Sequence, residues 1–204
     1  MPAHVRQTAA TKNAANDFGL ISSRSKIIRE HLRPYIMDVR SKVMQAELKK
    51  ALRQELASHK NADGSSEISA LKGFSFNEAF KIEQCLKFPL TVQQPANTLV
   101  SIQIPAFNPV QSIMASEGTT RVDIQAITVS FSFDKLKSSC EIADVLSIPY
   151  SDDMRAAEII NLQISGRSGE LVLVFLALNY WKGKGKITKN SYSPLEIIEV
   201  FKKG

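Results

Sequence analysis

The first third of the chain places its apolar residues at helical spacing. Over residues 17–59 they recur every three or four positions, and the lysines and arginines lie largely off this stripe. Pro34 interrupts the pattern, because proline lacks a backbone donor and disfavours helical backbone at the residue before it. We therefore expect two helices, or one kinked helix, with the second part running from Tyr35 to Ser58. The apolar stripe includes Ile28, Leu32, Tyr35, Val39, Val43, Leu48 and Leu52.

Two polar segments flank this helical region. Residues 1–16 are small and polar, which predicts an extended arm that a partner must hold in place. Residues 60–73 contain the run Asp63-Gly64-Ser65-Ser66, a strong turn signal, and form a linker. We place the domain boundary in this linker.

Beyond residue 73 the apolar period changes from 3.6 to 2, which predicts β-strands in residues 74–204. Six or seven short strands without long intervening helices favour an antiparallel β-sandwich of immunoglobulin-like or fibronectin-like type, so the fold class is α+β. The alternation covers Leu86 to Val92, Val100 to Ile104, Val122 to Phe133, Ile160 to Ile164, Leu171 to Leu178 and Leu195 to Phe201.

Three of these strands carry finer predictions. The alternation of Val122 and Ile124 continues on the opposite phase from Ile127, which indicates a β-bulge at Ala126-Ile127. The segment Leu171 to Leu178 is apolar on both faces and predicts a central strand. Residues 165–169 are rich in glycine and serine and predict a hairpin turn between two strands.

Composition excludes several classes of protein. A hydrophobic share of 44% is that of a globular chain, and no apolar run approaches the roughly 20 residues of a membrane span. Cys85 and Cys140 are the only cysteines, so no disulfide scaffold is expected and each is interpreted as a small buried hydrophobe. An apolar signal segment is absent from the N-terminus, which favours the cytoplasm, with signal-less export as the alternative.

The sequence argues against catalysis. All 3 histidines (His4, His31 and His59) precede residue 60, so a histidine site in the strand region would need a side chain from the helices. Asp152-Asp153 is interpreted as a turn, and Asp134, Glu141 and Asp144 lack the spacing of a calcium loop. The run from Gly183 to Thr188 fails the phosphate-loop pattern, because Ile187 occupies the Ser/Thr place. We therefore expect no catalytic residue, no metal and no cofactor.

Charge divides the chain into three parts. Residues 1–60 carry 12 Lys and Arg against 5 Asp and Glu, residues 61–181 carry 8 against 13, and residues 182–204 carry 6 against 2. An acidic body between two basic ends suggests nucleic acid, an acidic partner or a second copy of the chain. The residues that could contact nucleic acid are Arg29, Arg33, Arg40, Lys182, Lys184, Lys186 and Lys189, with Trp181 and Tyr192 near the lysine loop.

Several motifs resemble those of a group of uncharacterised Bacteroidota proteins that have a helical start and a β-sandwich end. The motifs are Arg6-Gln7-Thr8, Asn16-Asp17-Phe18-Gly19, Ser22 to Lys26, Leu32-Arg33-Pro34, Gly73 to Asn77 and Ile104 to Pro109. The resemblance would span most of the chain. It brings no activity and implies a bacterial, non-secreted and non-enzymatic protein.

These observations lead to two functional hypotheses. The first is a non-catalytic structural protein that forms homo-oligomers or polymers through its arm, its apolar helical stripe and its sandwich. The alternative is a nucleic-acid-binding protein that uses the basic helices and the lysine loop at residues 182–189.

Overall fold

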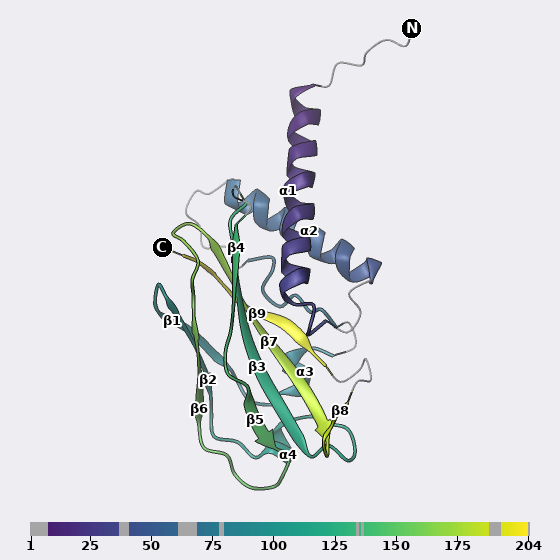
Figure 1. Ribbon diagram of the computed structural model, residues 1–204, viewed down its shortest axis with the longest axis vertical. Helices are drawn as coiled ribbons and strands as arrows, with labels where there is room; N and C mark the ends of the chain where they lie inside the picture. The colour runs from purple at the N-terminus through teal and green to yellow at the C-terminus, as the bar shows by residue number, and fades with distance from the viewer. Residues whose placement is uncertain are drawn as a thin grey trace.

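Two N-terminal helices precede a set of antiparallel β-sheets (Figure 1). The computed structural model describes residues 8–36, 41–60, 69–77, 80–133, 135, 137–187 and 193–203. The α+β class expected from the change of period is confirmed, with helix first and antiparallel strand afterwards.

The helical region forms two helices that separate around Pro34, as expected. Helix α1 spans Ala9–His31 and α2 spans Lys42–Lys60, with a turn over residues 32–35 between them. The predicted extended arm is wrong for residues 9–16, because the Thr8 hydroxyl accepts the backbone N–H of Thr11 at 3.2 Å and caps an alanine-rich first turn. Residues 1–7 lie outside the described part. The second helix also begins later than Tyr35, since the turn at Pro34 includes that residue.

The larger sheet is organised around two long strands. Strand β3 (Arg121–Phe131) pairs antiparallel with β7 (Leu171–Lys182) along its whole length. On the outer side of β3 lie β4 (Ser138–Ile142) and β5 (Leu146–Pro149), and on the outer side of β7 lie β8 (Gly185–Lys186) and β9 (Leu195–Lys202). The prediction that Leu171 to Leu178 forms a central strand is confirmed.

The smaller sheet has the order β1 (Thr91–Ala96), β2 (Leu99–Ile104) and β6 (Glu158–Gln163). Two four-residue helices, α3 (Ile82–Cys85) and α4 (Pro109–Ser112), lie beside it. The strand predicted from Leu86 begins only at Thr91, after Pro89. The predicted hairpin at residues 165–169 is also wrong, because these residues connect β6 of the small sheet to β7 of the large one.

The predicted β-bulge at Ala126-Ile127 is absent. The register of β3 against β7 runs without a break from Arg121 opposite Trp181 to Phe131 opposite Leu171. Val122, Ile124 and Ala126 pack in the core shared with the small sheet, whereas Ile127, Val129 and Phe131 pack in the core shared with the helices. The apolar phase changes because the covered face changes along a regular strand, and successive side chains point to opposite faces.

The helices therefore belong to the same body as the large sheet. Four stripe residues of α1, its C-cap and α2, namely Ile28, Leu32, Leu48 and Leu52, have no exposed surface and pack with Leu173 and Phe175 of β7. A loop separates the helices from the strands in sequence, but the two regions share one hydrophobic core.

A buried arginine ties α1 to the end of β3. Arg24 has no exposed surface, and one of its terminal nitrogens donates to the backbone carbonyls of Phe133 at 3.0 Å and Lys135 at 2.5 Å. These carbonyls follow the last residue of β3, where the ladder no longer supplies donors. Hydrogen bonds from a charged donor are stronger than neutral ones, so this contact holds the helix on the sheet.

We expect Arg24→Met to lower the free energy of unfolding by about 2–4 kcal/mol, because it keeps the aliphatic stem but leaves buried carbonyls unpaired. Urea denaturation followed by circular dichroism measures the change. Arg29→Met is the matched control on the same helix, since Arg29 is half-buried and its Nε bonds only the Ser25 carbonyl of its own helix. Equal stability of the two variants would show that the bonds to Phe133 and Lys135 contribute nothing.

Candidate interaction surfaces

The predicted self-association stripe is mostly covered by the chain's own sheet. Ile28, Leu32, Leu48 and Leu52 are buried there, and Tyr35 is half-buried, with burial as the main cause of its raised pKa. Val43 is 60% exposed, and Val39 lies outside the described residues. These buried side chains are unavailable to a second copy, so the stripe is corrected to an internal contact. The apolar face of an amphipathic helix needs one apolar surface to pack against, and the sheet provides that surface.

The first half of α1 extends away from the rest of the molecule (Figure 1). We call residues 9–20 the projecting helix. None of its residues is buried, and the first buried position of α1 is Ile21. Residues 9–16 are all exposed, and Asp17 and Leu20 are half-buried. A helical segment with so little packing is marginal in water, because helices in proteins are stabilised mainly by their packed face. The helical state of this segment is therefore only slightly more stable than its unfolded state unless a partner binds it.

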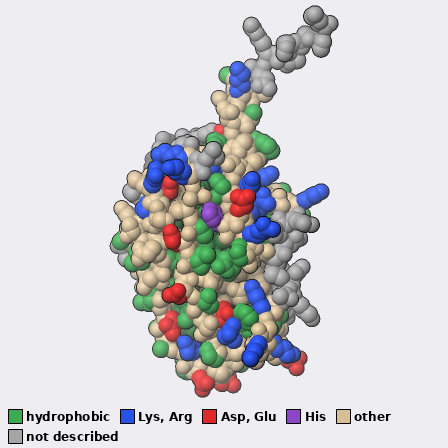
Figure 2. Space-filling view, viewed as in Figure 1, with side chains coloured by type: hydrophobic (Ala, Val, Ile, Leu, Met, Phe, Trp, Pro, Cys, Tyr) green, Lys and Arg blue, Asp and Glu red, His purple; other side chains and the backbone are tan. Residues whose placement is uncertain are grey.

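One large apolar side chain stands on the projecting helix, inside a basic surface. Phe18 is 58% exposed, and the Lys49 ammonium of α2 lies 5.8 Å from its ring centroid. Lys42 and Arg53 lie on the same side of α2 as Lys49, seven and four residues away, and both are exposed. We call Phe18, Lys42, Lys49 and Arg53 the basic helical surface. Lysine and arginine side chains are visible on both sides of the base of α1 in Figure 2.

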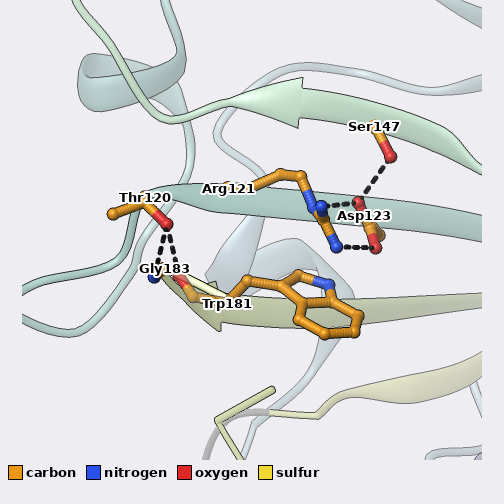
Figure 3. Close-up of polar contacts among 6 residues, drawn as sticks. All are labelled: Thr120, Arg121, Asp123, Ser147, Trp181 and Gly183. Carbon is orange, nitrogen blue, oxygen red and sulfur yellow. Dashed lines mark hydrogen bonds and ion pairs between the residues drawn. The ribbon is translucent and has the colours of Figure 1, made fainter. Parts of the chain in front are cut away.

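A second basic group follows β7 at the far end of the large sheet, as Figure 1 shows. A tight hairpin leaves β7 at Trp181: β8 pairs with Trp181 and Lys182, and Gly183 turns with a φ of 57°. The hydroxyl of Thr120 accepts the Gly183 N–H at 3.0 Å and donates to the Trp181 carbonyl at 3.2 Å (Figure 3). These bonds attach the hairpin to the start of β3.

Trp181 is already engaged by a neighbouring strand. The Arg121 guanidinium lies 4.3 Å from the Trp181 ring centroid, directly across the β3–β7 ladder. Arg121 also pairs with Asp123, with 3.0 Å between Nε and Oδ1, and the Ser147 hydroxyl donates to the same carboxylate oxygen at 2.7 Å (Figure 3). One face of the indole is thus covered by a cation that an acid holds in place, which leaves only the other face for stacking.

The residues predicted to contact nucleic acid do not form one surface. Lys182 and Lys184 are exposed and Lys186 is half-buried, all on the β7–β8 hairpin. Arg33 is exposed and Arg29 half-buried at the helical end, whereas Arg40 and Lys189 lie outside the described residues. The two groups lie at opposite ends of the large sheet in Figure 1, so the predicted contact residues do not gather at one place.

The acidic pair Asp152-Asp153 occupies an exposed bend, as the turn interpretation predicts. The Ser151 hydroxyl donates to Asp153 at 3.1 Å within that bend, and the Asp152 carbonyl accepts from Asn108 at 2.6 Å. The Tyr150 hydroxyl donates to the Ile113 carbonyl at 3.0 Å, and burial raises its pKa. Within the described ranges, no three His, Cys, Asp or Glu side chains gather as metal ligands.

The two cysteines are unpaired and differ in burial. Cys85 is buried, as expected, whereas Cys140 is only half-buried in β4. Burial is the largest cause of the raised pKa of each thiol. Both thiols therefore stay protonated at neutral pH, which disfavours nucleophilic chemistry.

A groove with an acidic rim lies where the two sheets meet at one edge. We call it the acidic groove; it has a volume of about 320 Å³ and is lined by residues 143–146 and 158–161. Its walls come from the β4–β5 connection and from β6, the edge strand of the small sheet. Asp144 and Glu158 line it, and Val145 and Ile159 in its lining are 50% and 60% exposed. The pattern analysis missed this groove, because neither β4 nor β5 was predicted as a strand.

A second groove of about 370 Å³ lies between β9 and the residues that lead into β1. Leu86, Phe88, Leu90 and Ile198 contribute apolar walls, and Glu196 of β9 places a half-buried carboxylate among them. Its oxygen accepts the backbone N–H of Ile82 at 3.0 Å. Burial raises the pKa of Glu196, Glu83 adds to this, and the Ile82 N–H and Lys81 act in the opposite sense. At neutral pH the buried charge of this carboxylate therefore lowers the stability of the fold.

We expect Glu196→Gln to stabilise the fold at neutral pH, because an amide oxygen can keep the Ile82 bond without the desolvated charge. A raised folded-state pKa means that wild-type stability increases as pH falls through that pKa. The advantage of the variant should therefore shrink from pH 7 towards pH 4. Thermal melts of both proteins across this range measure the difference. A constant difference over the whole range would contradict the assignment, and Glu117→Gln at an exposed position serves as the control.

No protein-family model, curated protein or solved structure matches the chain. The resemblance to Bacteroidota proteins with a helical start and a sandwich end therefore stays a prediction. None of the described helices is long and apolar enough to cross a membrane.

Proposed function

We propose that this chain is a non-catalytic assembly protein that forms homo-oligomers or polymers. The projecting helix carries the proposal: its residues 9–16 are all exposed, and it presents the exposed Phe18 ring. A helix in this situation gains stability when a partner covers it. This contact element replaces the covered stripe in the original hypothesis.

The segregation of charge favours another copy of the chain as the partner. The region up to residue 60 is basic, and residues 61–181 hold 13 acidic against 8 basic residues. Opposite charge on two parts of one chain attracts the basic end of one copy to the acidic body of the next. The exposed bend at Asp152-Asp153 and the protonated thiols give no support to a catalytic role.

The same proposal includes a finer description of the strand region. The expected six or seven strands are too few, because the described residues form sheets of three and six strands. The core between these sheets supports an immunoglobulin-like or fibronectin-like sandwich. The two unpaired cysteines suit a reducing compartment such as the cytoplasm. Both statements remain proposals that accompany the assembly function.

We expect the full chain to sediment as an oligomer at high protein concentration and Ala14→Pro to sediment as a monomer. Proline inside a helix costs about 3 kcal/mol, and Ala14 lies in the projecting helix where nothing is buried. The melting temperature should stay close to that of the wild type, because the packed half of α1 is untouched. Ala14→Ser is the matched control. A wild-type chain that remains monomeric at every concentration would overturn the proposal.

The alternative, nucleic-acid binding, rests on the exposed Lys182 and Lys184 of the hairpin. It requires affinity for single-stranded DNA or RNA that falls steeply with salt, with each lost phosphate contact lowering the slope of log K by about 0.7. We expect fluorescence anisotropy to show no such binding by the wild type at low salt. Tight binding that Lys182→Ala and Lys184→Ala each weaken with a reduced slope would favour the alternative instead.

A further inference from the structure

We propose that the basic helical surface of one copy docks into the acidic groove of a second copy, with the Phe18 ring inserted between β6 and the β4–β5 connection. This inference rests on the proposed self-association and specifies its two surfaces. The contact is head-to-tail, because the two surfaces lie on different parts of the same chain.

Exposed apolar side chains gather at the acidic groove. Among the described residues, seven large hydrophobic side chains are exposed, and three of them, Ile142, Val145 and Ile159, lie in or beside this groove. Such a cluster on a sheet edge favours contact with a partner, because a single exposed side chain is ordinary but a cluster at a concave site is not. Phe18 is the exposed aromatic ring that the helical end offers to it.

The charges around the two surfaces are complementary. Lys42, Lys49 and Arg53 lie along one side of α2, and the Lys49 ammonium lies 5.8 Å from the centroid of the Phe18 ring. At the groove, Asp144 and Glu158 are in the lining and Glu141 precedes the exposed Ile142, with Arg155 as the cation that pairs with Glu158 at 3.2 Å. An exposed aromatic ring beside basic side chains of α2 thus meets exposed aliphatic side chains beside carboxylates, which steers the encounter and fixes its orientation.

The same charges disfavour the symmetrical arrangements. If two grooves met across a twofold axis, the acidic rims would face each other, and if two basic helical surfaces met, Lys49 would face its own copy. Like charges brought together at an interface suppress the wrong pairing. The remaining arrangement joins unlike surfaces and generates a closed ring or an open filament, depending on whether the rotation between copies closes.

The test uses full-length chains that each lack one of the two surfaces. Phe18→Asp removes the helical surface and keeps the groove, whereas the double variant Val145→Asp and Ile159→Asp removes the groove and keeps the helix. All three positions are at least half exposed, so the fold tolerates the change. Val43→Asp on α2 and Val110→Asp on α4 are matched controls, at exposed positions of 60% and 41% outside both surfaces.

Sedimentation velocity is measured on each chain alone and on equal mixtures. We expect both surface variants to be monomers, with self-association weakened about thirtyfold or more, and both controls to assemble like the wild type. Mixing Phe18→Asp with the groove variant restores one intact pair of surfaces, so a heterodimer should form and nothing larger. Circular dichroism confirms that each variant is folded, and Ile159→Asp alone replaces the double variant if that one unfolds.

The outcomes separate this inference from the proposed function. A groove variant that assembles like the wild type would overturn the docking site and leave self-association standing. Monomeric variants whose mixture also stays monomeric would overturn the head-to-tail arrangement. A wild type that is itself monomeric removes the proposed function and this inference together.

Discussion

The β3–β7 ladder is the constraint on which the rest of the structure depends. Its two strands are buried on both faces over most of their length, so the backbone pairs are satisfied within the sheet while the apolar side chains need cover on both faces. The helices and the small sheet are the covers for its opposite faces. Neither cover is a separate unit, because each is completed by side chains from the same two strands.

Buried cations bind the helices and the segment from the small sheet to the β3–β7 ladder near its end. Arg24 binds the carbonyls beyond β3, and the Lys203 ammonium bonds the carbonyls of Ile164 and Gly166 in the segment that crosses from the small sheet to β7. That crossing is tight: a Cβ on Gly166 would lie 2.8 Å from the Cβ of Ser130. In both places a charged side chain donates to backbone carbonyls that the sheet leaves unpaired. These hydrogen bonds offset the unfavourable burial of Arg24 and Lys203.

The apolar pattern is a good predictor of which residues are buried. It is a poor predictor of which part of the molecule covers them. Leu171 to Leu178 was recognisable as a central strand, because burial on both faces removes polar residues altogether. The change of phase after Ala126 was misinterpreted as a bulge, since a sequence shows that a side chain is covered but not by what. Arg24 lies three residues after Ile21 and four before Ile28, so its helical register with buried positions was the available signal for its burial. The acidic groove joins segments 143–146 and 158–161, whose proximity depends on the meeting of two sheets and cannot be predicted from local periodicity.

Helix α1 is continuous from its exposed end to its packed end, and this has a geometrical consequence. Residues 9–20 extend for roughly 18 Å along the axis of α1, whose direction is set by the packing of its second half against the sheet. The direction in which Phe18 points around the helix axis is therefore fixed by the direction of the buried Ile21. Inserting a single residue between them would turn the ring by about 100° around the helix axis without disturbing the core, whereas inserting seven would return it nearly to its starting direction, about one nanometre further out. The spacing and pitch of any assembly built on this helix are thus encoded in the number of residues between one exposed ring and one buried isoleucine.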